Sequence, residues 1–278
     1  TIIIEVIYLK VSILTENRTS KGKFLAEHGL SLFIEHNGIN ILFDTGQTDV
    51  YCHNADIMGV DLRKTDCIVL SHGHYDHCGG YVHFPVKEKY PITYVREMAF
   101  ERKFTKDKNG YREIGIQWYY NDYKDNIILT ESKTKIVENI YLCSDIPFSV
   151  PFEEPFKGLL VQNGEEKITD RMQDEQMLVI DTEKGIVIFI GCSHPGIANC
   201  LSYVMKLFPN KKINTVFAGM HLEVVSDERF EKTIEFLKQL DIDKIIPVHC
   251  TGVTKACEMK RIFGEHCSVY GAGDSFEI

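Results

Sequence analysis

Short apolar runs of strand length recur along the first portion of the chain, separated by polar turns. The Asn37–Gly38 pair between two of these runs is a strong signal for a tight hairpin, because both residue types accept a positive φ angle. A continuous apolar run such as Cys67–Leu70 is typical of a strand buried on both faces. The expected strands of this portion cover residues 2–14, 30–37, 39–46 and 67–70, with a helix over about 51–58.

Strands and helices alternate in the second portion, which begins near residue 176. The segment that starts at Ser226 places Phe230, Ile234 and Leu237 at helical spacing, which predicts a helix packing one face on a sheet. Such alternation is typical of parallel strands covered by helices. The expected order is strand–turn–strand over 176–191, helix 195–208, strand 213–220, helix 226–240, strand 244–248, helix 252–263 and strand 268–278.

Residues 98–125 differ from both portions, because they are rich in charged and aromatic side chains and contain the single tryptophan, Trp118. We predict one domain over residues 1–278 with an insertion or lid at about 98–125. A surface excursion with its own small hydrophobic cluster is the alternative. The stretch 146–157 alternates aromatic residues with prolines, and its phenylalanines, like Trp118, either stack on a planar ligand ring or pack in the core. These phenylalanines are Phe148, Phe152 and Phe156.

Composition and charge limit the kinds of partner. The chain has 278 residues, of which 44% are hydrophobic and 26% charged, as is ordinary for a globular protein. A formal net charge of −9 argues against a nucleic-acid or anionic membrane surface, and no apolar run approaches the roughly 18–20 residues of a membrane span. A small anionic substrate stays compatible, because metal ions reverse the local field of a pocket. The nine cysteines, without any C-x-x-C pair, favour a reducing cytosol.

The decapeptide Ser71–Gly80, SHGHYDHCGG, holds four strong metal-ligand side chains directly after a buried apolar run. Side chains two residues apart on an extended segment point to the same side, so His72 and His74 are expected to converge on one ion. Asp76 and His77, beyond the turn, are expected to converge on a second. Imidazole and carboxylate together suit Zn²⁺, Mn²⁺ or Fe²⁺ and not Ca²⁺. The motif therefore predicts two divalent metal ions, with zinc preferred.

Three segments together resemble the metallo-β-lactamase superfamily: ILFDTG ending at Gly46, the SHGHYDHCGG motif, and the late PVHCTG. The resemblance extends over nearly the whole chain and implies an α/β fold, the four-layer αββα sandwich built from two β-rich halves. It implies that the ligands of the metal motif are joined by His249 of PVHCTG at the second metal. It also implies that Asp44 of ILFDTG lies behind the site, where a carboxylate orients a metal-binding histidine.

The chain departs from this family at two ligand positions. Members commonly place a histidine in a P-G-H-T-like segment and a bridging aspartate after a glycine, whereas this chain has DRMQDEQ and Gly191–Cys192 at those places. His194 is the leading candidate for the missing imidazole. Cys192 is a candidate bridging thiolate or ligand, and Asp174 or Glu175 is a candidate carboxylate ligand. The sequence leaves these alternatives open.

A narrower resemblance rests on the segments AEHGLSLFIE, GCSHPGIAN, AGMHL and PVHCTG. They are similar to the archaeal and bacterial subfamily that includes the dihydropterin–ribofuranosylaminobenzene phosphate synthase, which joins a pterin methyl diphosphate to an arylamine. The resemblance implies a substrate-binding role for Glu27 and His28 of AEHG, and a structural pair is the alternative. His221 of AGMHL follows another expected strand, where it would bind substrate or transfer a proton.

Reaction chemistry follows from the two expected ions. A two-metal site lowers the pKa of bound water and clamps the attacking and leaving oxygens. We therefore expect a metal-dependent hydrolase or transferase for a small, phosphorylated or pterin-like substrate, with Asp76 and His221 in catalytic roles. A di-iron redox protein and a binding protein without catalysis are the alternatives on the same fold.

Overall fold

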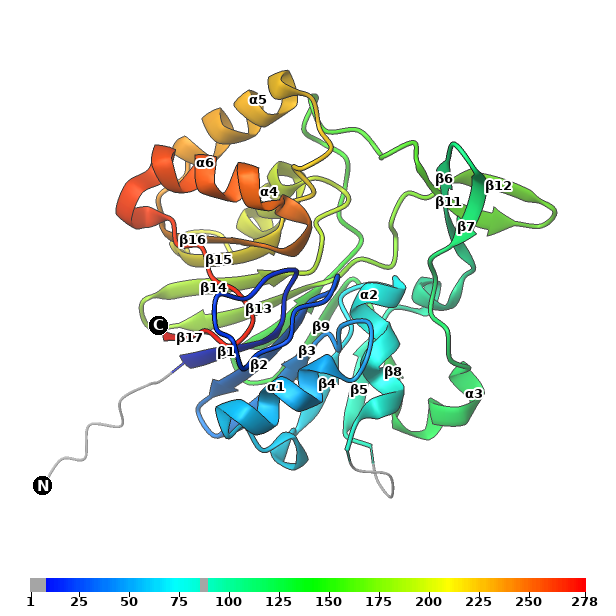
Figure 1. Cartoon of the computed structure of the whole chain (residues 1–278). Coiled ribbons are helices and arrows are strands. Elements are labelled where there is room, and N and C mark those ends of the chain that lie inside the picture. Colours follow the sequence, from blue (N-terminus) through cyan, green and yellow to red (C-terminus); the bar gives the residue numbers. More distant parts are fainter. Residues whose placement is uncertain (1–8, 86–89) are drawn as a thin grey trace, which may run out of the picture.

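Two large β-sheets face each other, and helices cover the outer face of each (Figure 1). The computed structural model describes residues 9–85 and 90–278. Within these residues the first large sheet has seven strands in the order β17-β1-β2-β3-β4-β5-β8. The second has six strands in the order β16-β15-β14-β13-β10-β9. A third, smaller sheet stands beside them, with four strands in the order β12-β11-β6-β7 (Figure 1).

The strands are three to seven residues long. The first sheet consists of β1 (Leu9–Thr15), β2 (Ser31–His36), β3 (Ile39–Phe43), β4 (Cys67–Val69), β5 (Ile92–Val95), β8 (Ile127–Leu129) and β17 (Ser275–Glu277). The second consists of β9 (Lys133–Val137), β10 (Ile140–Cys143), β13 (Met177–Thr182), β14 (Gly185–Ile190), β15 (Ile213–Gly219) and β16 (Ile242–Val248). The small sheet consists of β6 (Lys103–Asp107), β7 (Gly110–Glu113), β11 (Leu159–Asn163) and β12 (Glu166–Thr169).

The helices are of two kinds, α-helices and short 3₁₀-helices. The α-helices are α1 (Val50–Met58), α2 (Tyr75–Cys78), α3 (Tyr120–Tyr123), α4 (Ile197–Leu207), α5 (Asp227–Lys238) and α6 (Val253–Phe263). The 3₁₀-helices are Leu62–Lys64, Gly79–His83, Glu97–Phe100, Lys124–Asn126, His249–Thr251 and Gly264–His266. None of the helices in the described part of the chain is long and apolar enough to cross a membrane.

The central core lies between the two large sheets. Alternate residues of a strand face opposite sides, so β2 sends Ile34 inward and Phe33 outward. The inward residues of the first sheet, such as Ile34 and Phe43, meet those of the second, such as Phe189 and Phe217. The ring centroids of Phe43 and Phe189 are 6.3 Å apart across this interface. The apolar faces of both sheets are thereby removed from water.

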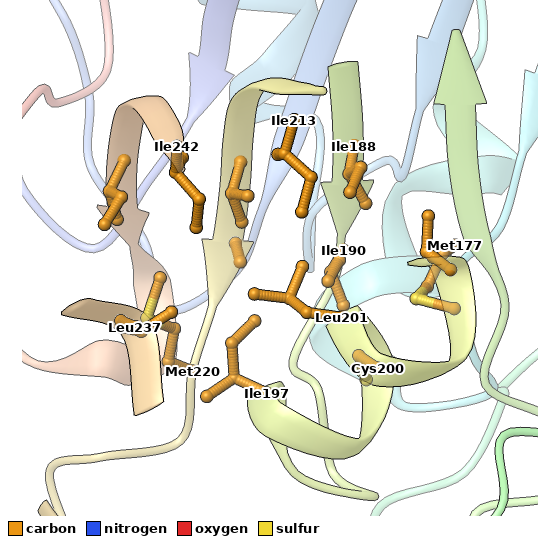
Figure 2. Packing of buried hydrophobic residues seen from close by; sticks show 14 of the residues in the cluster. Met177, Ile188, Ile190, Ile197, Cys200, Leu201, Ile213, Met220, Leu237 and Ile242 are labelled. Carbon is orange, nitrogen blue, oxygen red and sulfur yellow. The ribbon is translucent and has the colours of Figure 1, made fainter. Parts of the chain in front are cut away.

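Two further clusters cover the outer faces of the sheets. On the second sheet, Ile197 and Leu201 of α4 lie in one apolar cluster with Ile188 and Ile190 of β14 (Figure 2). The predicted helix after Ser226 is confirmed as α5, and it buries the residues that its spacing selected, Phe230, Ile234 and Leu237. On the first sheet, α1 packs its buried face over the strands. Helices on both outer faces confirm the predicted four-layer αββα sandwich.

The predicted hairpin and the two predicted terminal strands can each be compared with the structure. The hairpin turn is confirmed, because Asn37 and Gly38 have φ angles of 48° and 77° between paired β2 and β3. Part of the predicted first strand, residues 2–8, lies outside the described residues. The predicted closing strand over 268–278 is too long, since only Ser275–Glu277 pairs with β1. Gly273 just before it has a φ of 88°, which turns the backbone out of an extended conformation.

The 98–125 segment supplies β6 and β7 of the small sheet, and β11 and β12 come from later in the chain. Trp118 belongs to the core: it is 8% exposed, it stacks on Tyr81 at 4.6 Å between ring centroids, and its Nε1 donates to the Cys78 carbonyl. The prediction that Trp118 stacks on a ligand is therefore wrong, because protein groups already occupy both its ring and its N–H. That the segment covers a bound substrate stays a prediction.

Candidate metal centre

Residues with metal-binding side chains follow the carboxyl ends of parallel strands. β3 and β4 are parallel neighbours in the first sheet, and β14, β15 and β16 are parallel neighbours in the second. The carboxyl ends of parallel neighbours meet at one sheet edge, which gathers the residues that come after them. These residues are Asp44 after β3, His72 after β4, Cys192 and His194 after β14, His221 after β15 and His249 after β16.

Four residues at these strand ends adopt a left-handed backbone conformation without being glycine. The φ angles are 58° for Asp44, 48° for Ser193 and 49° for both His221 and His249. Each such residue costs on the order of 1–3 kcal/mol, and clusters of them are typical of functional sites. The left-handed turn at each strand end changes the chain direction, so that the next side chains reach the shared edge.

The first group of donors contains His72, Cys192 and His194, whose possible ligand atoms all lie within 4.8 Å of one another. His74 joins this group, because its Nδ1 is 3.1 Å from Nε2 of His72. The rings of His74 and His194 are 4.8 Å apart between centroids. The structure thus brings the predicted pair His72 and His74 together with His194, the leading candidate for the missing imidazole.

The second group of donors contains His77, Cys192 and His249, also within 4.8 Å of one another. The Nε2 atoms of His77 and His249 are 3.2 Å apart, and Oδ2 of Asp76 is 3.3 Å from Nε2 of His249. Sγ of Cys192 is 3.2 Å from Nε2 of His77. Cys192 therefore belongs to both groups and lies between them, at the place that a bridging ligand would occupy.

Four of the five histidines in these two groups have a protein partner on their outer nitrogen. Such a partner fixes the ring and leaves the other nitrogen free to face the centre. The outer pairs are Nδ1 of His72 with Ser71 Oγ at 2.9 Å, Nδ1 of His77 with Asp44 Oδ2 at 2.7 Å, Nδ1 of His194 with Glu175 Oε2 at 2.9 Å, and Nδ1 of His249 with Asn17 Oδ1 at 2.8 Å. Asp44 thus lies behind the site, as expected, and the same carboxylate also accepts from Ser71.

Burial controls the protonation of these groups. It lowers the pKa of His72 and His74 well below the ordinary value, and with neighbouring imidazoles it lowers the pKa of His249 to about 4. These imidazoles are neutral at pH 7. Burial acts to raise the pKa of Asp76, but the adjacent His77 and His249 outweigh it and hold that pKa well below the usual range. An ionised carboxylate therefore stands beside neutral nitrogen donors.

This donor set fits divalent metal ions. Inner nitrogens of the histidines approach to 3.1 and 3.2 Å in the two groups, and both groups are buried. Burial acts to lower the pKa of His77, but the Asp44 and Asp76 carboxylates outweigh it and raise that pKa. Lone pairs at such distances repel unless a proton or a cation lies between them. Imidazole, thiolate and carboxylate together are the donors that zinc and iron prefer. His72, His74 and His194 would hold one ion, Asp76, His77 and His249 a second, with Cys192 between them.

Two further candidates for ligation have other partners in the structure. Oδ2 of Asp174 accepts from the Gly73 N–H at 2.7 Å, and its Oδ1 lies 3.0 Å from Nζ of Lys103. Oε2 of Glu175 accepts from both the backbone N–H and Nδ1 of His194 at 2.9 Å. Oε1 of Glu175 is buried without a hydrogen-bond partner among the described residues. Neither carboxylate belongs to a group of converging donor atoms in the described part of the chain.

His221 lies at the rim of the first group. Its ring is 4.9 Å from that of His194 and 5.6 Å from that of Phe156, between centroids. Burial, helped by neighbouring imidazoles, lowers the pKa of His221 to about 3, so it is a neutral donor or acceptor. Phe156 is 38% exposed beside it, whereas Phe148 is covered by the Arg171 guanidinium at 5.4 Å. Phe156 thus contacts His221 at the rim of the centre.

The AEHG loop contributes His28 but uses Glu27 elsewhere. Nε2 of His28 is 3.1 Å from Oδ2 of Asp76, and His28, Asp76 and His249 form a third set of close donors. The His28 side chain is 55% exposed, so it lies at the open side of the second group. Both oxygens of Glu27 accept hydrogen bonds from the backbone and side chain of residues 47 and 48. Glu27 therefore holds the turn after β3, and its predicted substrate contact finds no support in this geometry.

Comparison with known proteins identifies the family. Residues 26–192 match the family model described as "Metallo-beta-lactamase superfamily". The chain belongs to the metallo-β-lactamase superfamily. The match covers the metal motif, both flanking strands and Cys192, and it confirms the resemblance that the motifs carry.

Relatives and solved structures add detail. The chain is 32% identical to the uncharacterized protein MJ0448 of Methanocaldococcus jannaschii, over 91% of this chain and 94% of that protein. It is 30% identical to the 7,8-dihydropterin-6-methyl-4-(β-D-ribofuranosyl)-aminobenzene-5'-phosphate synthase of the same organism, over 88% of each. The crystal structure of Tm1679, described as a metal-dependent hydrolase of the β-lactamase superfamily, has a TM-score of 0.84 and 30% identity and covers 97% of this chain and 99% of that chain.

Several residues that orient the centre carry no recognisable sequence signal. Asn17 is 232 residues from His249, and its polar loop looks like any other loop. Lys103 lies in the charged 98–125 segment, where a buried lysine is not expected. Glu175 is a candidate ligand by sequence, and its contact with His194 arises only because β13 and β14 pair. An alignment of relatives would be the signal able to single out such positions.

Proposed function

We propose that the protein is an enzyme that uses two divalent metal ions to hydrolyse, or to transfer, a group at a phosphate-bearing small molecule. The observation that carries this proposal is the pair of buried donor groups joined at Cys192. Two ions held side by side supply Lewis acidity that activates water and neutralises the charge of phosphoryl oxygens. The family membership and the similarity to a structure described as a metal-dependent hydrolase support the same class of activity.

The residues around the centre have separate tasks in this proposal. Asp76, His77 and the other donors bind the ions. His221 is neutral and lies beside His194 and Phe156, where it donates to or accepts from a substrate oxygen. Phe156 contacts a flat ring of the substrate. Such an aromatic contact contributes about 0.5–1.5 kcal/mol beyond the burial of apolar surface. His28 lies at the open side of the second group and meets the substrate as it enters.

A pterin-type transferase is the finer form of this proposal. It is supported by the 30% identity to the dihydropterin-methyl-ribofuranosyl-aminobenzene phosphate synthase over 88% of each chain. A substrate with a diphosphate leaving group and a planar pterin ring would use both the ions and Phe156. A plain hydrolase of phosphate esters would need the ions alone.

Metal analysis followed by competition assays tests the proposal. Protein purified without added metal should contain close to two divalent ions per chain, and Asp76→Ala should lose metal and turnover while keeping its circular dichroism spectrum. In a screen of phosphodiester, thioester and lactone substrates, inorganic phosphate and diphosphate should inhibit, and a pterin phosphate analogue should inhibit more strongly. Efficient turnover of neutral lactones without any binding of phosphate compounds would replace the proposal with a hydrolase of acyl compounds. Metal without turnover would favour a redox or binding protein.

A further inference from the structure

Three consecutive polar side chains, Asp174, Glu175 and Gln176, lie fully buried just before β13. Burial of a carboxylate or an amide is costly unless its hydrogen bonds are made. Gln176 contacts the chain just before the metal motif, because its N–H donates to the Ser71 carbonyl and its Nε2 to the Leu70 carbonyl, each at 2.8 Å. The other two residues reach the centre itself.

Glu175 holds His194 at two points. One oxygen, Oε2, lies 2.9 Å from both the backbone nitrogen and Nδ1 of His194. The carboxylate therefore fixes the position of the residue and the rotation of its ring at once. Since Nδ1 of His194 is engaged, its Nε2 is left for an ion. Sequence neighbours alone do not fix this ring, because Ser193 before it turns through a left-handed conformation.

Asp174 holds the loop between two other donors. Its Oδ2 accepts from the N–H of Gly73, which lies between His72 and His74. A Cβ at Gly73 would come within 2.1 Å of the Ala99 carbonyl oxygen, so the loop is also pressed against the 98–125 segment. The loop is thus held from two sides, by a carboxylate and by a backbone contact.

The charge of Asp174 is balanced from the small sheet. Nζ of Lys103 in β6 lies 3.0 Å from Asp174 and 2.7 Å from Asp170, and Lys103 is 1% exposed. The same segment contacts the metal motif again where the Tyr75 N–H donates to the Ile114 carbonyl at 2.9 Å. The 98–125 segment therefore contacts the metal motif at both Gly73 and Tyr75.

We propose that Glu175 and Asp174 are positioning residues for the half of the centre formed by His72, His74 and His194, and that the small sheet supports metal binding through Lys103. This inference rests on the proposed metal centre. It assigns the small sheet, to which the predicted 98–125 insertion supplies β6 and β7, to the support of the ligands. Partners that orient metal-binding histidines are worth roughly 10–100-fold in metal affinity.

Variants of Glu175 test the first part. Glu175→Met keeps the side-chain volume but removes the acceptor, whereas Glu175→Gln keeps an acceptor and loses the charge. Titration of metal-stripped protein with Co²⁺, followed by absorption, should show one of two binding steps weakened roughly 10–100-fold in Glu175→Met and less in Glu175→Gln. Asn17→Ala, which frees His249, should weaken the other step. The double variant that combines Glu175→Met with Asn17→Ala should then show both Co²⁺ binding steps weakened.

Asp174→Asn and Asp170→Asn form a matched pair for the second part. Each aspartate accepts with both oxygens, Asp174 from Gly73 and Lys103, and Asp170 from Met172 and Lys103. An asparagine has one acceptor oxygen, so in each variant one contact becomes donor against donor. Only Asp174 touches the metal motif, so only Asp174→Asn should weaken Co²⁺ binding beyond what its change in melting temperature explains.

The outcomes separate this inference from the proposed function. If the unmodified protein binds no divalent ion, the metal centre itself is wrong. If it binds two ions, and Glu175→Met and Asp174→Asn bind both as tightly as it does, only the positioning roles are wrong. Equal losses of affinity in Asp174→Asn and Asp170→Asn would also overturn the role of Asp174, because a general loss of stability would then suffice.

Discussion

At the scale of single residues, the centre depends on how each imidazole is turned. A histidine offers two nitrogens, and the one that meets a metal is decided by the partner of the other. Ser71, Asp44, Glu175 and Asn17 each take one outer nitrogen. His74 is the exception, since its Nε2 is buried with no hydrogen-bond partner among the described residues. Its ring is held by packing among its neighbours.

Cys192 and His194 should respond differently to substitution. His194→Ala removes a donor from the first group only, so one of the two ions should be lost and the other retained. Cys192→Ser touches both groups and should weaken both ions mildly, because a hydroxyl is a poorer ligand than a thiolate for zinc. Metal content after dialysis, measured by atomic emission, checks this. Cys200→Ser is the control, since Cys200 is buried in α4 outside both groups. Loss of both ions in His194→Ala would contradict the division into two groups.

At the scale of elements, the strand ends and the small sheet together position the metal-binding side chains. The parallel strands β14, β15 and β16 deliver their following residues to one edge. The 98–125 segment supports the metal motif from outside. Trp118 is part of that support, because its Nε1 donates to the carbonyl of Cys78 in the motif at 2.9 Å.

Substitution of Trp118 should therefore lower stability. Trp118→Ala removes a buried indole and its hydrogen bond, and should reduce the free energy of unfolding by about 3–5 kcal/mol. The neighbouring Tyr119 is 78% exposed, and Tyr119→Ala should change it by less than about 0.5 kcal/mol. Urea unfolding followed by circular dichroism measures both. Equal and small effects would instead favour a loosely attached lid.

At the scale of the whole molecule, the protein gathers several imidazoles in a buried centre while its full chain carries a net charge of −9. Burial lowers the pKa of His249 to about 4 and that of His221 to about 3, from an ordinary value of 6.5. The unfolded chain binds protons at these histidines below about pH 6.5, whereas the folded protein does not. Stability therefore falls as the pH drops from about 6.5 toward 4.

Metal-stripped protein should show this acid sensitivity in its melting temperature. The melting temperature should decrease steadily between pH 7 and pH 4, and His249→Gln should reduce the slope because one titrating group is gone. His53→Gln alters an exposed histidine and should leave the slope unchanged. Added Zn²⁺ at pH 7 should raise the melting temperature, since an ion that binds only the folded protein stabilises it. A melting temperature independent of pH would show that these histidines bind protons equally in the folded and the unfolded protein.

Much of the fold and half of the centre follow from local pattern. Alternating and continuous apolar runs predict strands at β2, β3, β4 and β13 to β16, because the period of a strand is written in adjacent residues. The four donors between His72 and His77 are also recognisable from sequence, because they lie within six consecutive residues. The helix after Ser226 and the hairpin at Asn37–Gly38 were likewise decided by residues close in sequence.

Tertiary structure decided the rest, because it brings together residues whose separation along the chain follows no rule. Cys192 lies between the two donor groups, and Glu175 lies behind His194, only because β13 and β14 pair and the two sheets stack. Asn17 meets His249 across 232 residues. Trp118 is core and not ligand-facing, because folding places Tyr81 and the Cys78 carbonyl beside it. Local sequence fixes which side chains are present and their period, whereas the stacking of the sheets fixes which of them meet.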